Sequence, residues 1–293
     1  MNIQGIKMKS PSQIHLSQRV SGNPLSIDTG FQAQSFKHDQ FDGLMDPLVM
    51  MDHFTMTEPT FGAHPHAGMS AVSMLFEDSK GVFNNQDSLG NNVDLNPGDA
   101  YWLKAGKGAV HDEKPTAGSC THGLQIFVNL PKQYKHDAAR SLHVSAKYIP
   151  IITGDNYRVR VVFGKSNGIT GAMPPSLPFT ILDAHLKEGG QYDHAVAGDQ
   201  SVLIYAVSGT VDLNLDQHTI KLLEGQAIAM QADFDSTFLG LSGASDAHIV
   251  VLQGAPIREH FVQKGPFIMS TTQEINAVTA AYDAGQLGSI PTA

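Results

Sequence analysis

Two short segments of the sequence concentrate residue types that bind transition metals. His64 and His66 flank a proline in "FGAHPHAGM", and His111 and Glu113 have the same i, i+2 spacing in "GKGAVHDE". Side chains two residues apart point to the same side of an extended backbone, so each pair can face one interior point. Pro65 lacks an N–H, which suits an edge or the start of a strand. If the two segments lie side by side, three imidazoles and one carboxylate converge.

This set of donors favours a first-row transition metal. Imidazole binds Fe, Ni, Cu and Zn well, and a carboxylate adds a hard oxygen ligand and a negative charge. A single His-x-His among 14 histidines is often incidental, so the hypothesis depends on both pairs occurring together. His53 and His122 are interpreted as core residues or as residues that orient a ligand. His194 is interpreted as structural or exposed.

The sequence does not support nucleophilic hydrolysis. It contains no G-x-S-x-G elbow. Cys120 lies in a Gly/Ser/Thr-rich stretch with no sequence-local base that could activate it. Metal chemistry is therefore the better-supported hypothesis.

The composition indicates a β-rich protein of the cytoplasm. Only 16% of the 293 residues are charged and 28 are glycine, which suits many tight turns. The net charge of −9 argues against nucleic acid or an anionic membrane as a direct partner. The single cysteine cannot form an internal disulfide. The N-terminal "MNIQGIKMKSPSQIH" has no apolar signal-peptide core, and no stretch of about 18 apolar residues occurs, so we expect a soluble cytoplasmic chain.

Short apolar or alternating runs bounded by turn residues predict an all-β sandwich or barrel. The clearest runs are "AVSMLF", "GLQIFVNL", "YRVRVVFG", "SVLIYAVSG", "TVDLNL" and "AHIVVLQG". One helix is predicted at "STTQEINAVTAAYDAGQ". Thr271 can cap it, Glu274 can complete a capping box, and Gly285 can end it. Its apolar stripe consists of Ile275, Val278 and Tyr282.

A weak internal repeat divides the chain. "LNPGDAYWLKAGKGAVH" resembles "LLEGQAIAMQADFDSTF", and aligning Gly98 with Gly225 places Phe238 opposite His111. Two copies of one β unit are therefore predicted, of which only the first keeps the histidines. The polar segment "KQYKHDAARSLHVSAKYIP" is the expected connection between them.

These motifs together resemble the pirin family. The resemblance begins at "DPLVMMDHFTM", continues through "HPHAGM", "QDSLGNN", "LNPGDAYWLKAGKGAVHDE" and "HGLQIFVNLP", and resumes at "QKGPFIMSTTQEINAVTAAYDAGQLG". It implies an all-β fold of two tandem cupin (double-stranded β-helix, jelly-roll-like) barrels with a short C-terminal helix. The expected units are a metal-binding N-terminal cupin over 1–135, a connection over 136–150, a degenerate C-terminal cupin over 151–263 and a helical tail over 264–293.

The resemblance also implies a cofactor and an activity. The family usually holds iron through three histidines and one glutamate, which match His64, His66, His111 and Glu113. We therefore expect one divalent transition metal, Fe(II) first, with Ni, Cu, Mn, Co or Zn as alternatives. Several members resemble quercetin 2,3-dioxygenases, which open the heterocyclic ring of flavonols with O2. Eukaryotic members are instead linked to transcription factors as redox-sensitive coregulators.

The first hypothesis is a metal-dependent dioxygenase that takes a small flavonol-like substrate and O2. Glu113 would be both ligand and the base that accepts the substrate's hydroxyl proton. Each histidine would be oriented by a hydrogen bond through its other nitrogen. The alternative is a non-enzymatic, metal-binding protein that responds to redox state and acts through a protein partner. A third hypothesis is a cupin with a structural metal and a closed coordination shell.

The chain departs from the family's usual residues beside the expected ligands. Ala67 and Met69 replace Arg and Phe, and Tyr101 replaces Gln. Asp112 replaces a small residue and Asn85 replaces His. None of these is an expected ligand, but together they change the expected wall of the cavity. The resemblance therefore does not fix the substrate.

Overall fold

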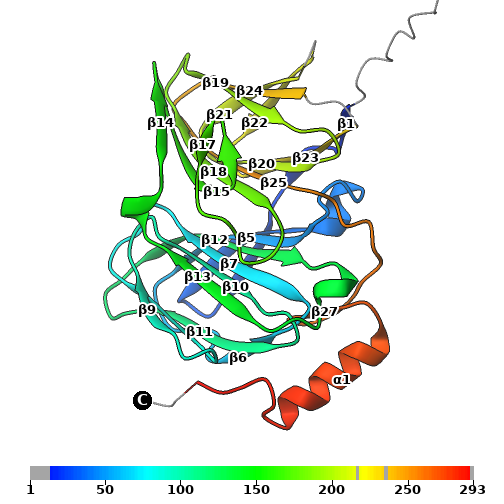
Figure 1. Cartoon of the computed structure of the whole chain (residues 1–293). Coiled ribbons are helices and arrows are strands. Elements are labelled where there is room, and N and C mark those ends of the chain that lie inside the picture. The colour runs from blue at the N-terminus through cyan, green and yellow to red at the C-terminus, as the bar shows by residue number, and fades with distance from the viewer. Residues whose placement is uncertain (1–13, 216–217, 234–236, 291–293) are drawn as a thin grey trace, which may run out of the picture.

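The computed structural model describes residues 14–215, 218–233 and 237–290. Within them the chain forms two β-barrels, one above the other in Figure 1, and one α-helix near the C-terminal end. The predicted all-β architecture with a short C-terminal helix is confirmed. All six runs predicted as strands lie in strands of the structure.

The first barrel combines a seven-stranded and a four-stranded antiparallel sheet. The larger has the order β13-β10-β7-β12-β5-β4-β3 and the smaller the order β6-β11-β8-β9. The larger sheet contains β3 (Asn23–Ile27), β4 (Phe31–Lys37), β5 (Leu48–Met56), β7 (Met69–Leu75), β10 (Ala100–Lys104), β12 (Thr121–Asn129) and β13 (Arg140–Val144). The smaller contains β6 (His64–His66), β8 (Phe83–Asp87), β9 (Asn92–Leu95) and β11 (Ala109–Pro115).

The second barrel has the same construction. Its larger sheet has the order β1-β23-β20-β25-β18-β15-β14, with β2 also on β23, and its smaller sheet has the order β19-β24-β21-β22. The larger contains β1 (Ile14–Leu16), β2 (Val20–Ser21), β14 (Ile151–Gly154), β15 (Tyr157–Phe163), β18 (Phe179–Leu186), β20 (Ser201–Ser208), β23 (Gln226–Ala232) and β25 (Ala247–Gly254). The smaller contains β19 (Gln191–Val196), β21 (Thr210–Leu215), β22 (His218–Leu223) and β24 (Thr237–Gly243).

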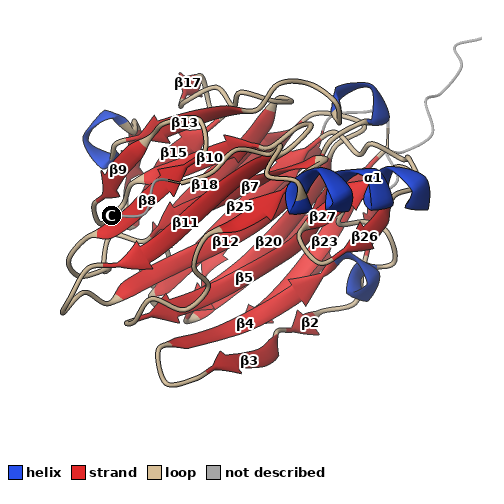
Figure 2. Ribbon diagram, turned by 90° about the horizontal axis from the view of Figure 1, so that it is seen from below, coloured by secondary structure: helices blue, strands red, loops and turns tan. Residues whose placement is uncertain are grey.

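The remaining elements are short. They are the hairpins β16 (Lys165–Ser166) with β17 (Ile169–Thr170) and β26 (Val262–Lys264) with β27 (Phe267–Met269), the 3-10 helices η1 (His38–Phe41), η2 (Lys132–Tyr134) and η3 (Ala146–Tyr148), and α1 (Thr272–Asp283). Thr271 caps α1 as predicted, since its hydroxyl accepts from the Glu274 N–H. The Glu274 carboxylate accepts from the N–H of Ser270, one residue before the expected partner. Figure 2 shows α1 beside β26 and β27.

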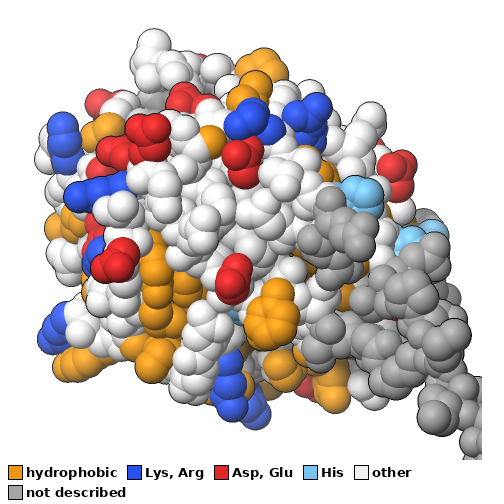
Figure 3. Space-filling model, turned by 90° about the horizontal axis from the view of Figure 1, so that it is seen from above, with side chains coloured by type: hydrophobic (Ala, Val, Ile, Leu, Met, Phe, Trp, Pro, Cys, Tyr) orange, Lys and Arg blue, Asp and Glu red, His pale blue; other side chains and the backbone are white. Residues whose placement is uncertain are grey.

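The outer face of the second barrel is mixed in character. Figure 3 shows acidic and basic side chains interspersed with apolar ones over this face. Among the residues that the structure describes, no helix has the length and apolar character needed to cross a membrane.

The matching strand orders agree with the predicted internal repeat. Gly98 and Gly225 both lie in turns with positive φ, 82° and 75°, directly before the corresponding strands β10 and β23. His111 in β11 then corresponds to Phe238 in β24, which is 65% exposed. His111 is only 2% exposed, so the two side chains aligned in the sequence point to opposite faces of their sheets and are not structurally equivalent.

One edge strand of the second barrel comes from the N-terminal part of the chain. β1 precedes the first barrel in the chain but pairs with β23 of the second. β13, by contrast, is the next strand after β12 in the chain and pairs with β10 of the same barrel. Residues 14–21 therefore extend the second barrel's sheet, although the sequence placed them in the 1–135 unit. The unit boundaries stay a prediction, and residues 1–13 and 291–293 lie outside the described residues.

The two large sheets pack face to face and form the central core. Trp102 of the first barrel contacts Phe163 and Phe179 of the second, with ring centroids 5.0 and 5.8 Å apart. The opposite face of each large sheet lines the interior of its own barrel. A strand covered on both faces must be apolar or internally paired throughout. β7 is such a strand, since all of its residues are buried.

A buried ion pair connects the barrels at the edge of this core. Arg160 is 1% exposed, and its Nη1 donates to Asp183 Oδ2 at 2.7 Å. Its Nη2 donates to the carbonyl of Gly98 in the first barrel. His248 Nε2 lies 2.6 Å from Asp183 Oδ1. Burial alone would raise the pKa of Asp183, but the hydrogen bond from His248 and the charges of His248 and Arg160 hold it below its usual value.

We expect Asp183→Asn to lower the free energy of unfolding by about 3–5 kcal/mol, because it leaves the Arg160 guanidinium buried without its counter-charge. Since the folded pKa of Asp183 lies below its unfolded value, its contribution is present above about pH 4 and is lost as the pH falls further. Urea denaturation measures both effects. Asp212→Asn, which breaks the exposed pair with Lys221, should cost less than about 1 kcal/mol. Equal losses of unfolding free energy in Asp183→Asn and Asp212→Asn would contradict the assignment of Asp183 as the buried counter-charge of Arg160.

Candidate metal centre

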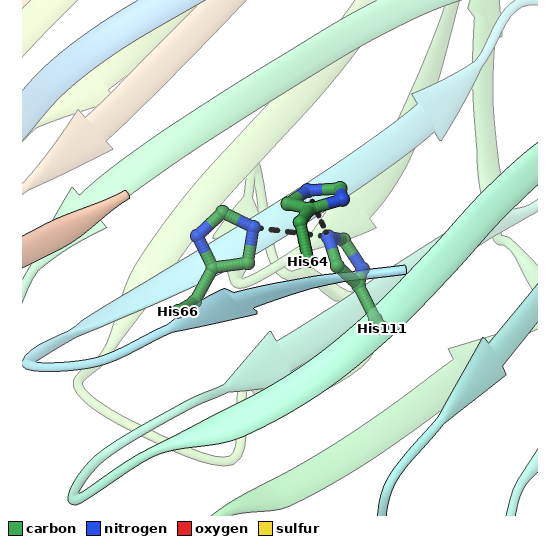
Figure 4. A group of neighbouring side chains, drawn as sticks. All are labelled: His64, His66 and His111. Atoms are coloured by element: carbon green, nitrogen blue, oxygen red, sulfur yellow. Dashed lines mark hydrogen bonds between the residues drawn. The ribbon is translucent and has the colours of Figure 1, made fainter. Parts of the chain in front are cut away.

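Strand register brings the three predicted histidines together. β6 pairs antiparallel with β11, so that His64 faces His111 and His66 faces Ala109. His111 Nε2 lies 2.9 Å from His66 Nε2 and 3.0 Å from His64 Nε2. Figure 4 shows the three rings from these two strands turned toward one another. Their ligand nitrogens all lie within 4.8 Å of one another.

The hydrogen-bond inventory of this cluster fits a bound cation. His64 Nδ1 lies 2.9 Å from the carbonyl of Gly62, which can only accept, so this nitrogen carries the proton. The lone pair of His64 Nε2 therefore points at His111. Without a cation, two imidazole nitrogens can lie this close only if one of them carries a proton and donates it to the other. A metal ion instead accepts the lone pairs of all three Nε2 atoms. The three imidazoles can thus hold a single metal ion.

Burial keeps these imidazoles neutral at pH 7. Desolvation, with a smaller contribution from His64, lowers the pKa of His66 to about 3. Desolvation and the two neighbouring imidazoles lower the pKa of His111 well below its usual value. The pKa of His64 is also lowered, chiefly by burial. A metal ion would therefore not have to displace protons from charged imidazoles.

Glu113 lies beside this cluster. It is 8% exposed, and its Oε2 lies 3.8 Å from His111 Nδ1. Its Oε1 accepts from Asn85 Nδ2 at 2.6 Å and from the Ser73 hydroxyl. Burial raises the pKa of Glu113 to about 7, although these two hydrogen bonds act to lower it. Its role as a fourth metal ligand stays a prediction, as does the ligand role of the three histidines.

Several residues around the cluster could not be identified from the sequence. Ser73 was not predicted, and Asn85 was noted only as a departure from the family pattern. Asn85 faces Glu113 in the register of β8 with β11, so it contacts Glu113 through strand pairing. The Tyr101 hydroxyl donates to Asp87 Oδ2 at 2.6 Å. His64 has a backbone partner in the carbonyl of Gly62, and a backbone hydrogen bond with Pro266 partly offsets the lowering of the His66 pKa. The buried Nδ1 of His111 has no hydrogen-bond partner among the described residues.

The other noted histidines lie away from this cluster. His53 Nε2 lies 2.7 Å from His122 Nε2, and His53 Nδ1 lies 2.6 Å from the Tyr205 hydroxyl of the second barrel. Both therefore belong to the contact between barrels. His194 is buried between Ser166 and Gln253, as a structural residue.

A cavity of about 350 Å³ opens beside the cluster. Its apolar wall consists of Phe31, Met50, Phe54, Met56, Phe61, Phe83 and Phe127. Its polar lining consists of Lys37, Asp52, His64, His66, Glu113, Gln125 and Gln263. This volume and this mixture are typical of a site for a small organic ligand.

The hairpin β26–β27 closes one side of the cavity, although it follows the second barrel in the chain. Lys135 Nζ donates to the carbonyls of Gly68 and Ile268, at 2.8 and 2.9 Å, and so ties the hairpin to the loop after His66. Gly68 has φ of 74°, and a Cβ there would lie 1.9 Å from the Ile268 carbonyl oxygen. Only glycine permits this close approach.

A second group, Asp183, His185 and His248, also places its ligand atoms within 4.8 Å of one another. It borders a cavity of about 900 Å³ between the barrels. Both oxygens of Asp183 already have partners, in Arg160 and His248. The rings of His185 and His248 are stacked, 4.1 Å apart with 17° between their planes, so their lone pairs lie in nearly parallel planes. We therefore assign the metal chemistry to the first group.

We expect His66→Ala and His111→Ala each to lower the affinity for Ni(II) or Fe(II) by at least ~100-fold, because each removes one of three converging nitrogens. Elemental analysis and competition with a chelator measure this loss. His136→Ala is the matched control, since that imidazole is 62% exposed and pairs with Glu274 instead. Stoichiometric metal in either of the first two variants would show that the cluster is not the site.

The lowered histidine pKa values also predict acid sensitivity of the metal-free protein. The unfolded chain binds a proton at His66 below about pH 6.5, whereas the folded state binds it only near pH 3. Stability should therefore fall as the pH drops through this window, by about 1.4 kcal/mol per pH unit for this residue. Urea denaturation in chelator measures the slope. His66→Gln should make it shallower, and an unchanged slope would contradict the assignment.

Models of protein families match both halves of the chain. The family described as Pirin matches residues 23–128, and the Pirin C-terminal cupin domain matches residues 181–288. These matches confirm the resemblance seen in the sequence, and they cover more than half of the chain.

Individual relatives and solved structures agree with these family matches. Pirin of Mus musculus is 33% identical over 79% of this chain and 79% of its own length. A quercetin 2,3-dioxygenase of Acinetobacter baumannii is 25% identical, with a TM-score of 0.83 over 96% of this chain and 100% of the other. The bacterial pirin YhhW of Escherichia coli, solved in complex with nickel(II), has a TM-score of 0.61 at 17% identity, over 83% of this chain and 100% of its own.

Proposed function

Since this chain belongs to the pirin family, we propose that it is a metal-dependent dioxygenase of the quercetin 2,3-dioxygenase type. It would open the heterocyclic ring of flavonol-like substrates with O2. The observation that carries the proposal is the meeting of three neutral imidazoles, with the buried carboxylate of Glu113 beside them, at an aromatic-lined cavity. The similarity to the dioxygenase of Acinetobacter baumannii supports it.

In this proposal His64, His66, His111 and Glu113 hold one divalent metal. Fe(II) is the proposed ion, with Ni, Cu, Mn, Co and Zn as alternatives, because imidazole and carboxylate donors accept all of them. When bound, the ion supplies Lewis-acid stabilisation of a substrate oxyanion and redox chemistry with O2. The site lies inside the first barrel, and we propose that the protein acts in the cytoplasm.

Glu113 is the proposed base. A general base works best when its pKa lies near the operating pH, and burial raises the pKa of Glu113 to about 7. Ser73 and Asn85 occupy its Oε1, which leaves Oε2 to accept the proton of the substrate's hydroxyl group. These two hydrogen bonds also fix the plane of the carboxylate.

The cavity wall positions the substrate. The rings of Phe31 and Phe61 meet edge to face, with centroids 4.9 Å apart, and Phe31 stacks against Phe54 at 5.9 Å. Such a wall favours a flat aromatic ligand and excludes water from the reacting end. The ligand would lie between this wall and the imidazoles.

The second candidate is a metal-binding protein that acts through protein partners in response to redox state. The identity to Pirin of Mus musculus, 33%, exceeds the 25% identity to the dioxygenase of Acinetobacter baumannii. This candidate needs the metal but no turnover. The two candidates therefore differ in a measurable way.

We expect the iron-loaded protein to consume quercetin in the presence of O2, followed as loss of flavonol absorbance. Glu113→Gln should lower kcat by about 10²–10⁴-fold, because the amide cannot accept the proton. Glu188→Gln, at an exposed glutamate of the second barrel, is the control and should leave kcat unchanged.

Full turnover in Glu113→Gln would remove this residue from the role of base. Retained metal with no turnover over a broad panel of flavonols would favour the second candidate.

A further inference from the structure

Gln125 presents a polar group to the cavity beside the metal centre. It lies in β12, where it pairs with Ser73 of β7. It is half-buried, and its amide contacts a single described partner, the Ser73 hydroxyl. The other end of the amide makes no hydrogen bond to a described residue and keeps accessible surface in the cavity. That end is therefore open to a ligand.

Two side-chain contacts place Gln125 next to the metal centre. Ser73 bridges it to Glu113, since the Ser73 hydroxyl contacts both Glu113 Oε1 and the Gln125 amide. Phe127 lies two residues further along the same face of β12. Its ring meets the ring of His66 edge to face, with centroids 5.1 Å apart. A ligand that reaches the imidazoles along this wall therefore passes the Gln125 amide.

The hydrogen atoms available around Ser73 decide which end of the amide faces the ligand. Ser73 Oγ lies 2.9 Å from Gln125 Oε1 and also contacts Glu113 Oε1, but a hydroxyl group has only one hydrogen to donate. As a metal-bound carboxylate, Glu113 is the stronger acceptor and takes that hydrogen. Two oxygens would then face each other with no hydrogen between them. A half-turn of the amide about its Cγ–Cδ bond removes this conflict, because it exchanges the oxygen and the nitrogen.

After this half-turn the amide of Gln125 has one free acceptor in the cavity. Nε2 donates to Ser73 Oγ, which still has lone pairs to accept it, and Oε1 faces the ligand. The wall on either side is apolar, since Phe127 follows on the same strand and Met50 and Phe54 lie on the neighbouring strand β5. A ligand that covers this wall displaces the water from the amide oxygen. It leaves that oxygen unpaired unless it supplies a hydrogen-bond donor.

We propose that Gln125 determines substrate specificity, because its amide oxygen accepts a hydrogen bond from a second hydroxyl group of the substrate, separate from the one that binds the metal. The inference rests on the proposed function, and it narrows the substrate class. The preferred substrates are flat aromatic compounds that carry a metal-binding hydroxyl and at least one further hydroxyl. Compounds with the first hydroxyl alone leave the amide oxygen without a partner and bind less tightly.

The test compares two flavonols that share the metal-binding hydroxyl. Quercetin carries further hydroxyl groups, and 3-hydroxyflavone carries none. Binding is measured by titration calorimetry with the full-length, zinc-loaded protein, since zinc has no redox chemistry and no turnover interferes. The variants are Gln125→Met, which keeps the length of the side chain and removes the amide, and Gln125→Leu, which repeats the test with a branched apolar side chain.

We expect the wild type to bind quercetin at least ~10-fold more tightly than 3-hydroxyflavone. Gln125→Met and Gln125→Leu should weaken quercetin binding by about 10-fold, because they remove the acceptor. They should bind 3-hydroxyflavone as tightly as the wild type or more tightly, because no amide oxygen is left unpaired. Gln32→Met, at an exposed glutamine of β4, is the matched control and should bind both flavonols as the wild type does. Elemental analysis and thermal unfolding report whether each variant keeps its zinc and its fold.

Equal weakening of both flavonols, or no weakening of either, would overturn the inference and leave Gln125 as a structural residue. Loss of zinc or of the fold in both Gln125 variants would do the same, and so would failure of both flavonols to bind the wild type. If the preference depends on Gln125 but the iron-loaded protein does not consume quercetin, the inference stands and the proposed oxygenase activity fails. If quercetin is consumed without any such preference, the proposed function stands and the inference fails.

Discussion

The antiparallel pairing of β6 with β11 positions every nitrogen of the candidate metal centre. His64 and His66 point inward because β6 is extended, and His111 meets them because of one particular register. A slip of one residue would turn each imidazole to the other side of the sheet. Neighbouring structure fixes that register. β8 pairs with the far side of β11, and Lys135 ties the loop after His66 to the C-terminal hairpin.

The clusters around His111 and around Asp183 contain similar residue types but differ in their ability to hold a metal ion, because their surroundings differ. Around His111 the imidazoles are neutral and their lone pairs converge, whereas the nearby carboxylate is held by neutral donors. Around Asp183 a guanidinium and an imidazole already occupy both oxygens, so the charge is balanced without any further ion. The first arrangement lacks a positive charge and the second already contains one. Composition alone would not separate a ligand site from an ion pair that joins two barrels.

Features with local causes could be predicted from the sequence, and features with non-local causes could not. The i, i+2 spacing identified the three histidines that converge and Glu113 beside them, and capping chemistry identified α1. Apolar runs predicted five strands of the large sheets and β21 of a smaller one. Asn85 and Ser73 reach Glu113 only through pairing of strands distant in the chain, and no local pattern encodes that pairing. The return of β26–β27 to the first barrel likewise depends on a close approach at Gly68.

The pairing of β1 with the second barrel has a consequence for folding during synthesis. Ile14 in β1 pairs with Ala232 in β23, roughly 200 residues later in the chain. At a translation rate of about 5–20 residues per second, β1 leaves the ribosome roughly 10–40 seconds before its partner exists. The last edge strand of the first barrel, β13, is instead the next strand after β12, so this sheet can be completed earlier. The nascent chain therefore exposes an unpaired strand through most of its production, and completion of the second barrel's large sheet is a late event.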